Sequence, residues 1–123
     1  MVPILKVVLQ RAASDCAVAV LAMLTGKTYE EILLAVGQEQ PKVLKKGLWV
    51  AEIIRIASAA GVPLKKRKKF DLETDCGILC LYDHVVVLKN GLVIDPADGS
   101  IWEADVYLAA CKEDAPLLLQ PKE

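Results

Sequence analysis

The first half of the chain repeats its apolar positions with the period of an α-helix. Residues 15–25 are predicted to form a first helix in which Val18, Leu21 and Ala22 make one apolar stripe. Gly26 follows directly, at the position where a glycine commonly ends a helix. The stripe is the face through which we expect this helix to pack.

Two more helices are predicted with clear boundaries. Thr28 and Glu31 have the spacing of a capping box, in which each side chain bonds the backbone amide of the other residue. Gly37 ends this second helix. A third helix is predicted over about residues 48–60, because apolar residues recur there at helical spacing and Gly61 then stops the pattern.

The period changes to that of a strand in the second half. Short strands are predicted over residues 64–70, 77–82, 84–89 and 92–95. Asn90-Gly91 between the last two is the strongest hairpin signal in the sequence. Asp98-Gly99 marks another turn, residues 103–111 are a plausible closing helix, and residues 115–119 form an apolar segment expected to pack back onto the domain.

Helices followed by antiparallel strands predict an α+β fold, with N-terminal helices packed on a C-terminal sheet. Residues 1–123 are enough for a single domain with its own core, and they contain no internal repeat or linker. Residues 2–9 are expected to lie extended, and residues 38–46 to form a polar connection.

Charge and hydropathy narrow the class of protein. A formal net charge of -1 gives no general case for binding nucleic acid or an anionic membrane. No apolar run approaches the roughly 18 residues of a membrane span, and the start of the chain lacks the basic region of a secretory signal. We therefore expect a cytoplasmic protein without a membrane span.

The basic run Lys65 to Lys69 leaves three interpretations open. A lysine-rich strand is a common way to keep a sheet edge from pairing with other molecules, and this is the interpretation we favour. The same charges would also suit an acidic peptide or protein partner. Binding to a phosphate backbone is the least favoured, because Phe70 is the only aromatic residue beside the run.

The four cysteines are too sparse for a disulfide framework. Cys76 and Cys80 are four positions apart, which is looser than the usual zinc pair, and only one histidine is present to complete a site. We expect reduced thiols, no metal and no cofactor.

Cys16 has the position of a nucleophile. It lies in the first turn of the predicted helix, after Ser14 and Asp15, both of which are good N-cap types. The free amides and positive dipole end of a helix start favour a thiolate over a thiol. Gln10, six residues upstream, carries an amide donor for a developing oxyanion. The alternative is an inert cysteine on the apolar face of the helix.

His84 is the one histidine in the chain, and hairpin geometry supplies it with a partner. If Asn90-Gly91 is a two-residue turn, Leu88 pairs with Val93 and the next partners place Asp95 on the same face as His84. A carboxylate there would orient the imidazole and favour its charged form. Asp83 points to the other face and ranks below Asp95. Taken alone, a hydrogen-bonded strand histidine and a strand-ending aspartate would be equally ordinary.

The combined pattern resembles the bacteriocin-processing, double-glycine cysteine peptidases of the papain-like superfamily. The resemblance lies in Gln10-x5-Cys16 with its following apolar run, in His84-Val85-Val86-Val87-Leu88, and in Asp95-Pro96-Ala97-Asp98-Gly99. Family members commonly have glycine after the cysteine, where this chain has Ala17, a small change.

The resemblance implies a compact papain-like cysteine peptidase fold and a peptide or protein substrate. Cys16 would be the nucleophile and His84 the base. Asp95 would orient the imidazole, while Gln10 and the Cys16 backbone amide would form the oxyanion hole.

Several functions remain compatible with these residues. We favour a cysteine peptidase that works through an acyl-enzyme on Cys16. A catalytically inactive papain-like domain that binds a peptide or protein is the second hypothesis. An acyl transferase using the same groups, in which an amine resolves the thioester, is the third, and a nucleic-acid binder using the lysine run is the last.

Overall fold

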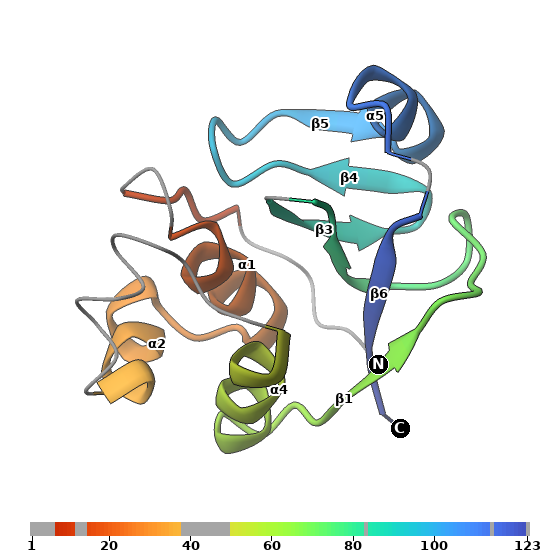
Figure 1. Ribbon diagram of the computed structural model, residues 1–123. Helices are drawn as coiled ribbons and strands as arrows, with labels where there is room; N and C mark the ends of the chain where they lie inside the picture. The colour runs from red at the N-terminus through yellow and green to blue at the C-terminus, as the bar shows by residue number, and fades with distance from the viewer. Residues whose placement is uncertain (1–6, 12–14, 38–49, 83, 114, 123) are drawn as a thin grey trace.

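The computed structural model describes residues 7–11, 15–37, 50–82, 84–113 and 115–122. In chain order the elements are α1 (Cys16–Thr25), α2 (Tyr29–Val36), α4 (Val50–Ala59), β1 (Leu64–Arg67), β2 (Gly77–Cys80), β3 (Val85–Lys89), β4 (Leu92–Ile94), β5 (Ile101–Glu103), α5 (Ala104–Ala110) and β6 (Leu117–Pro121). Figure 1 shows α1, α2 and α4 grouped beside the sheet, which confirms the predicted α+β order.

Two predicted segments fall wholly or partly outside the described residues. The polar connection at residues 38–46 is one of them, as is most of the extended segment at residues 2–9. The part of that segment which the structure describes, residues 7–9, belongs to no strand.

The described strands form one antiparallel sheet in the order β1-β6-β2-β3-β4-β5. The C-terminal segment was predicted only to pack back onto the domain, whereas it is strand β6, inserted between β1 and β2. Leu118 and Leu119 are both buried although they point to opposite faces of the sheet. A strand covered on both faces loses the alternation that reveals a strand in sequence.

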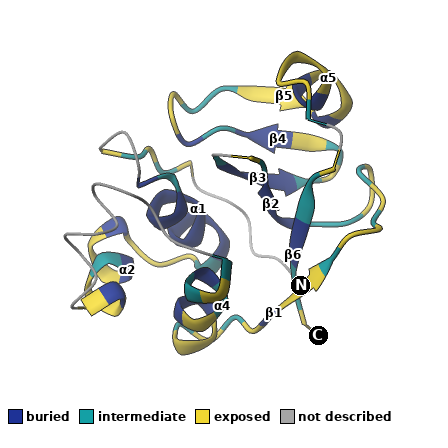
Figure 2. Ribbon diagram, in the orientation of Figure 1, coloured by how far each residue is buried: buried dark blue, intermediate teal, exposed yellow. Residues whose placement is uncertain are grey.

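Successive residues of each inner strand belong alternately to two hydrophobic clusters, one on each face of the sheet. Val85 and Val87 face the cluster built with α1, α2 and α4, whereas Val86 and Leu88 face the cluster built with α5. The sheet is therefore covered by helices on both faces, and Figure 2 shows its central strands buried. Both clusters contribute to stability through apolar area removed from water.

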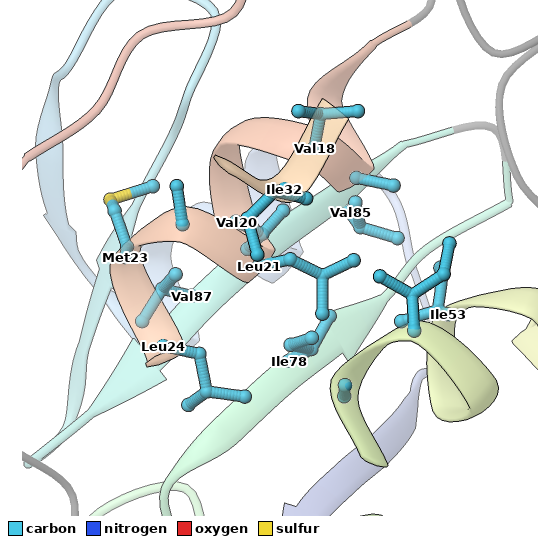
Figure 3. Close-up of a cluster of buried hydrophobic side chains, with 14 of the residues drawn as sticks. Val18, Val20, Leu21, Met23, Leu24, Ile32, Ile53, Ile78, Val85 and Val87 are labelled. Carbon is cyan, nitrogen blue, oxygen red and sulfur yellow. The ribbon is translucent and has the colours of Figure 1, made fainter. Parts of the chain in front are cut away.

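Helix α1 is more deeply buried than its sequence pattern predicted. Every residue from Ala17 to Leu24 is buried, so the predicted stripe of Val18, Leu21 and Ala22 is only part of the packed surface. The reason is its position: α1 packs on β3 and also contacts α2 and α4, which leaves no side for water. Figure 3 shows Val20 and Leu21 of α1 among Val85, Val87 and Ile53 of the surrounding elements.

The predicted helix ends are confirmed. The Thr28 side chain accepts from the Glu31 amide at 3.1 Å, and the Glu31 carboxylate accepts from the Thr28 amide at 3.1 Å. Gly26 follows α1 in the left-handed conformation, and its amide donates to the carbonyl of Ala22. Gly37 follows α2.

The first three residues of the basic run, Lys65 to Arg67, lie on β1 at one edge of the described sheet, which is the position that the favoured interpretation expects. Strand β1 pairs only with β6 among the described strands, and Lys65 and Lys66 are exposed. Arg67 instead donates to Gln120 Oε1 at 2.9 Å and lies 3.6 Å from a carboxylate oxygen of Asp75. The exposed lysines thus discourage a further strand from pairing here.

Gly77 provides a test of how tightly β2 and β6 are packed. A Cβ added at Gly77 would lie 2.2 Å from the backbone oxygen of Leu119, which cannot move aside as a side chain can. We expect Gly77→Ala to lower the free energy of unfolding by about 2 kcal/mol or more. Chemical denaturation followed by circular dichroism measures this change.

Gly26→Ala is the matched control. Its φ is also positive, at 75°, but an added Cβ meets nothing within 4 Å, so only the backbone strain of about 1 kcal/mol is expected. Equal losses in the two variants would contradict the clash at Gly77.

Candidate active site

Cys16 is the first residue of α1, as predicted, and its side chain is half-buried. Asp15 occupies the N-cap position by its backbone, and its carbonyl accepts from the Val18 amide at 3.0 Å. The predicted role of its side chain was wrong, because the carboxylate makes no bond to the first turn. Ser14 lies outside the described residues. Cys16 therefore meets the positive end of the helix dipole without a capping carboxylate.

His84 and Asp95 are brought together by the hairpin of β3 and β4. The register pairs Leu88 with Val93, and Asn90 and Gly91 have φ values of 52° and 79°, as a primed two-residue turn requires. His84 immediately precedes β3 and Asp95 immediately follows β4, so both lie at the same end of the antiparallel pair. His84 Nε2 is 2.8 Å from Asp95 Oδ1.

The other ring nitrogen of His84 remains available for Cys16. A hydrogen bond with Cys16 raises the pKa of His84, burial lowers it, and the bond with Asp95 raises it again, to about 9 in total. The imidazole is thus positively charged at neutral pH. A thiol beside an imidazolium is the arrangement in which thiolate and imidazolium form an ion pair.

Asp95 is a carboxylate with several donors. Burial raises the pKa of Asp95, but hydrogen bonds from the Ala97 amide, His84 and the Tyr107 hydroxyl outweigh it and hold the pKa below its ordinary value. The Ala97 bond is 2.9 Å long, and Tyr107 donates to Oδ2 at 2.8 Å. Asp95 is therefore negative beside the imidazolium at neutral pH.

Tyr107 was not found by sequence reasoning. It is buried on α5, and burial followed by the bond to Asp95 raises its pKa, so its hydroxyl remains a donor. Its ring packs edge-on against Trp102 with 6.0 Å between ring centroids. No signal in the sequence links residue 107 to residue 95, because α5 must first fold over the sheet to bring them together.

Gln10 is attached to the same end of the sheet. Its backbone amide donates to the carbonyl of Pro96 at 2.9 Å, and its side chain is half-buried. The bond joins the segment before α1 to the loop after Asp95. The structure thus brings His84 into contact with both Cys16 and Asp95, and it ties the backbone of Gln10 to the loop after Asp95.

The remaining cysteines are unpaired thiols. Burial first, and then the nearby charge of Cys16, raises the pKa of Cys80 to about 12, so Cys80 stays protonated beside the site. Within the described ranges, no group of histidine, cysteine, aspartate or glutamate side chains is arranged to hold a metal.

Asp83, which ranked below Asp95 as a partner for His84, lies outside the described residues. Trp102 on β5 is 41% exposed and contacts the ring of Tyr107.

No helix in the described part of the chain is both long and apolar enough to cross a lipid bilayer. No protein-family model matches the chain, and no characterised protein matches it significantly.

Solved structures do match almost the whole chain. A double glycine motif protease from an AMS/PCAT transporter, solved in complex with the leader peptide, is 20% identical with a TM-score of 0.69, over 98% of this chain and 94% of that one. The peptidase domain of Streptococcus ComA, a bi-functional ABC transporter involved in a quorum sensing pathway, is 19% identical with a TM-score of 0.66, over 97% of this chain and 100% of that one. The chain therefore has the papain-like α+β fold of the double-glycine peptidase domains.

Proposed function

We propose that this protein is a cysteine peptidase that cleaves a peptide bond through an acyl-enzyme on Cys16. The observation that carries the proposal is His84, whose imidazole contacts Cys16 and Asp95 at once. The contact to Cys16 supplies the ion pair, and the contact to Asp95 fixes the ring. The shared fold of the two peptidase domains supports the same activity.

The reaction follows from these contacts. The Cys16 thiolate attacks the carbonyl carbon, forming a carbon–sulfur bond and an oxyanion. The Gln10 side-chain amide and the Cys16 backbone amide are the proposed donors to that oxyanion. His84 then gives its proton to the leaving amine as the carbon–nitrogen bond breaks. In the second half, His84 takes a proton from water, which attacks the thioester and releases Cys16.

Asp95 and Tyr107 act through His84 in this scheme. Asp95 selects the ring orientation that directs the other nitrogen to Cys16, and it stabilises the imidazolium. Tyr107 holds the second oxygen of Asp95, so the carboxylate does not rotate away from the imidazole. Tyr107 is thus a positioning residue of the proposed site.

We propose a peptide or protein as the substrate and the cytoplasm as the compartment. The double glycine motif protease of similar fold was solved with a leader peptide, which supports a peptide substrate here. Free thiols, Cys16 among them, are kept reduced in the cytoplasm.

Alkylation of Cys16 tests the proposal without a known substrate. Iodoacetamide should react quickly with Cys16 down to about pH 5 in the native protein, because the imidazolium of His84 holds the thiolate. His84→Ala should abolish this reaction at low pH and leave a rate that rises only toward about pH 8.5. Mass spectrometry of the digested protein gives the rate at each cysteine.

Cys111 is the internal control, because its side chain is exposed and its contact is with Tyr107, not with the ion pair of Cys16 and His84. Identical pH profiles at Cys16 and Cys111 in the native protein would exclude the ion pair. The chain would then be interpreted as a domain that binds a peptide without cleaving it.

Tyr107→Phe tests the positioning of Asp95. Loss of its hydroxyl removes one donor from the carboxylate, so the pKa of Asp95 should rise. We expect the low-pH limit of rapid Cys16 alkylation to move upward and the rate at pH 7 to fall several-fold. Tyr82→Phe removes the same hydroxyl from a residue that is 94% exposed and should change neither. A Tyr107→Phe profile that superimposes on the native one would contradict the assigned role.

A further inference from the structure

Asp15 is fully buried, at 0% exposure. No other charged residue in the described part of the chain is buried. A buried carboxylate is costly unless hydrogen bonds replace the lost water. It lies directly before the proposed nucleophile, yet its side chain makes no capping bond to α1. Its burial next to Cys16 therefore needs another explanation.

The hydrogen bonds of Asp15 connect three segments. Its Oδ2 accepts from the Arg11 backbone amide at 2.9 Å and from the hydroxyl of Tyr29, the first residue of α2. The guanidinium of Arg11 lies over the Tyr29 ring, 4.1 Å from its centre, and pairs at the surface with Glu30. The segment before α1 is thereby tied to both α1 and α2.

Two backbone hydrogen bonds fix the position of Gln10. The Gln10 backbone amide bonds Pro96, and the amide of the next residue, Arg11, bonds Asp15. The proposed oxyanion donors are the Gln10 side chain and the Cys16 backbone amide. Gln10 directly precedes Arg11, and Cys16 directly follows Asp15. The Arg11–Asp15 bond therefore constrains the distance between the two donors.

We propose that Asp15 and Tyr29 are positioning residues that hold the two oxyanion donors at the spacing catalysis requires. The inference rests on the proposed function and extends it: both side chains are buried, so they act through Gln10 and Cys16. Tyr29 suits this role: burial, followed by the bond to Asp15, raises its pKa to about 12. Its hydroxyl thus keeps its proton wherever the ion pair of Cys16 and His84 exists.

Two reactions of the same thiolate separate this role from a merely structural one. With p-nitrophenyl acetate, the Cys16 sulfur forms a bond to the carbonyl carbon through an oxyanion, and p-nitrophenolate leaves with the electron pair of the broken carbon–oxygen bond. With iodoacetamide, the sulfur displaces iodide and no oxyanion forms. Only the first reaction needs the oxyanion hole. Both rates are measured at Cys16 on the full chain, by stopped-flow absorbance and mass spectrometry.

Tyr29→Phe should lower the rate of acylation about tenfold or more while alkylation stays within about twofold of the native rate. The ring remains in place against Arg11, and Asp15 keeps the Arg11 bond, so the fold should persist. If circular dichroism shows that it does not, Asp15→Asn is used, which keeps an acceptor oxygen but weakens both bonds. It should lower acylation in the same selective way, because it weakens the Arg11 bond that sets the spacing of the two donors.

Glu30→Gln is the matched control. It removes the exposed ion pair of Arg11 from the neighbouring position of α2 and should leave both rates unchanged, because such surface pairs contribute little. A loss in Glu30→Gln equal to that in Tyr29→Phe would overturn the assignment to Asp15 and Tyr29.

The remaining outcomes are equally informative. Acylation of a folded Tyr29→Phe at the native rate, or an equal loss of acylation and alkylation, would overturn the inference and leave the proposed peptidase intact. A native protein in which Cys16 is neither acylated nor rapidly alkylated would overturn the proposed function and this inference with it.

Discussion

The packing of α1 against β3 is the interaction on which the site depends. Cys16 begins α1 and His84 immediately precedes β3, so the contact between helix and strand sets the approach of sulfur to imidazole. Buried aliphatic side chains on both elements make this contact, and a close-packed interior resists small displacements. The geometry of the proposed chemistry is therefore carried by the hydrophobic core, which begins at Ala17 and Val85, the residues next to Cys16 and His84.

Electrostatics at the site is a balance between burial and hydrogen bonding. Burial alone would neutralise both His84 and Asp95, and their hydrogen bonds reverse this tendency at each residue. The hydrogen-bond partners come from different parts of the fold: α1 supplies Cys16 to His84, and α5 supplies Tyr107 to Asp95 from the other face of the sheet. At the open end of the β3–β4 hairpin, side chains from both faces of the sheet can contact His84 and Asp95. This explains why the charged groups lie there.

Short-range patterns in the sequence determined the start of α2 and the turn between β3 and β4. Thr28 and Glu31 specify their capping box, and Asn90-Gly91 specifies the hairpin turn, because the interacting groups are a few residues apart. The turn then determines the register, and register with a side-chain period of two was enough to place Asp95 beside His84. The position of Cys16 at a helix start was equally readable from its neighbours.

Tertiary structure alone decided the contacts between distant segments. The complete burial of α1 depends on β3, α2 and α4 surrounding it, and the insertion of β6 depends on its pairing with β1 and with β2. For the same reason, Asp15 bonds Tyr29 and Tyr107 bonds Asp95 without any sequence signal. A polar side chain finds a partner only after the core has fixed which segments meet, and that choice belongs to the whole chain.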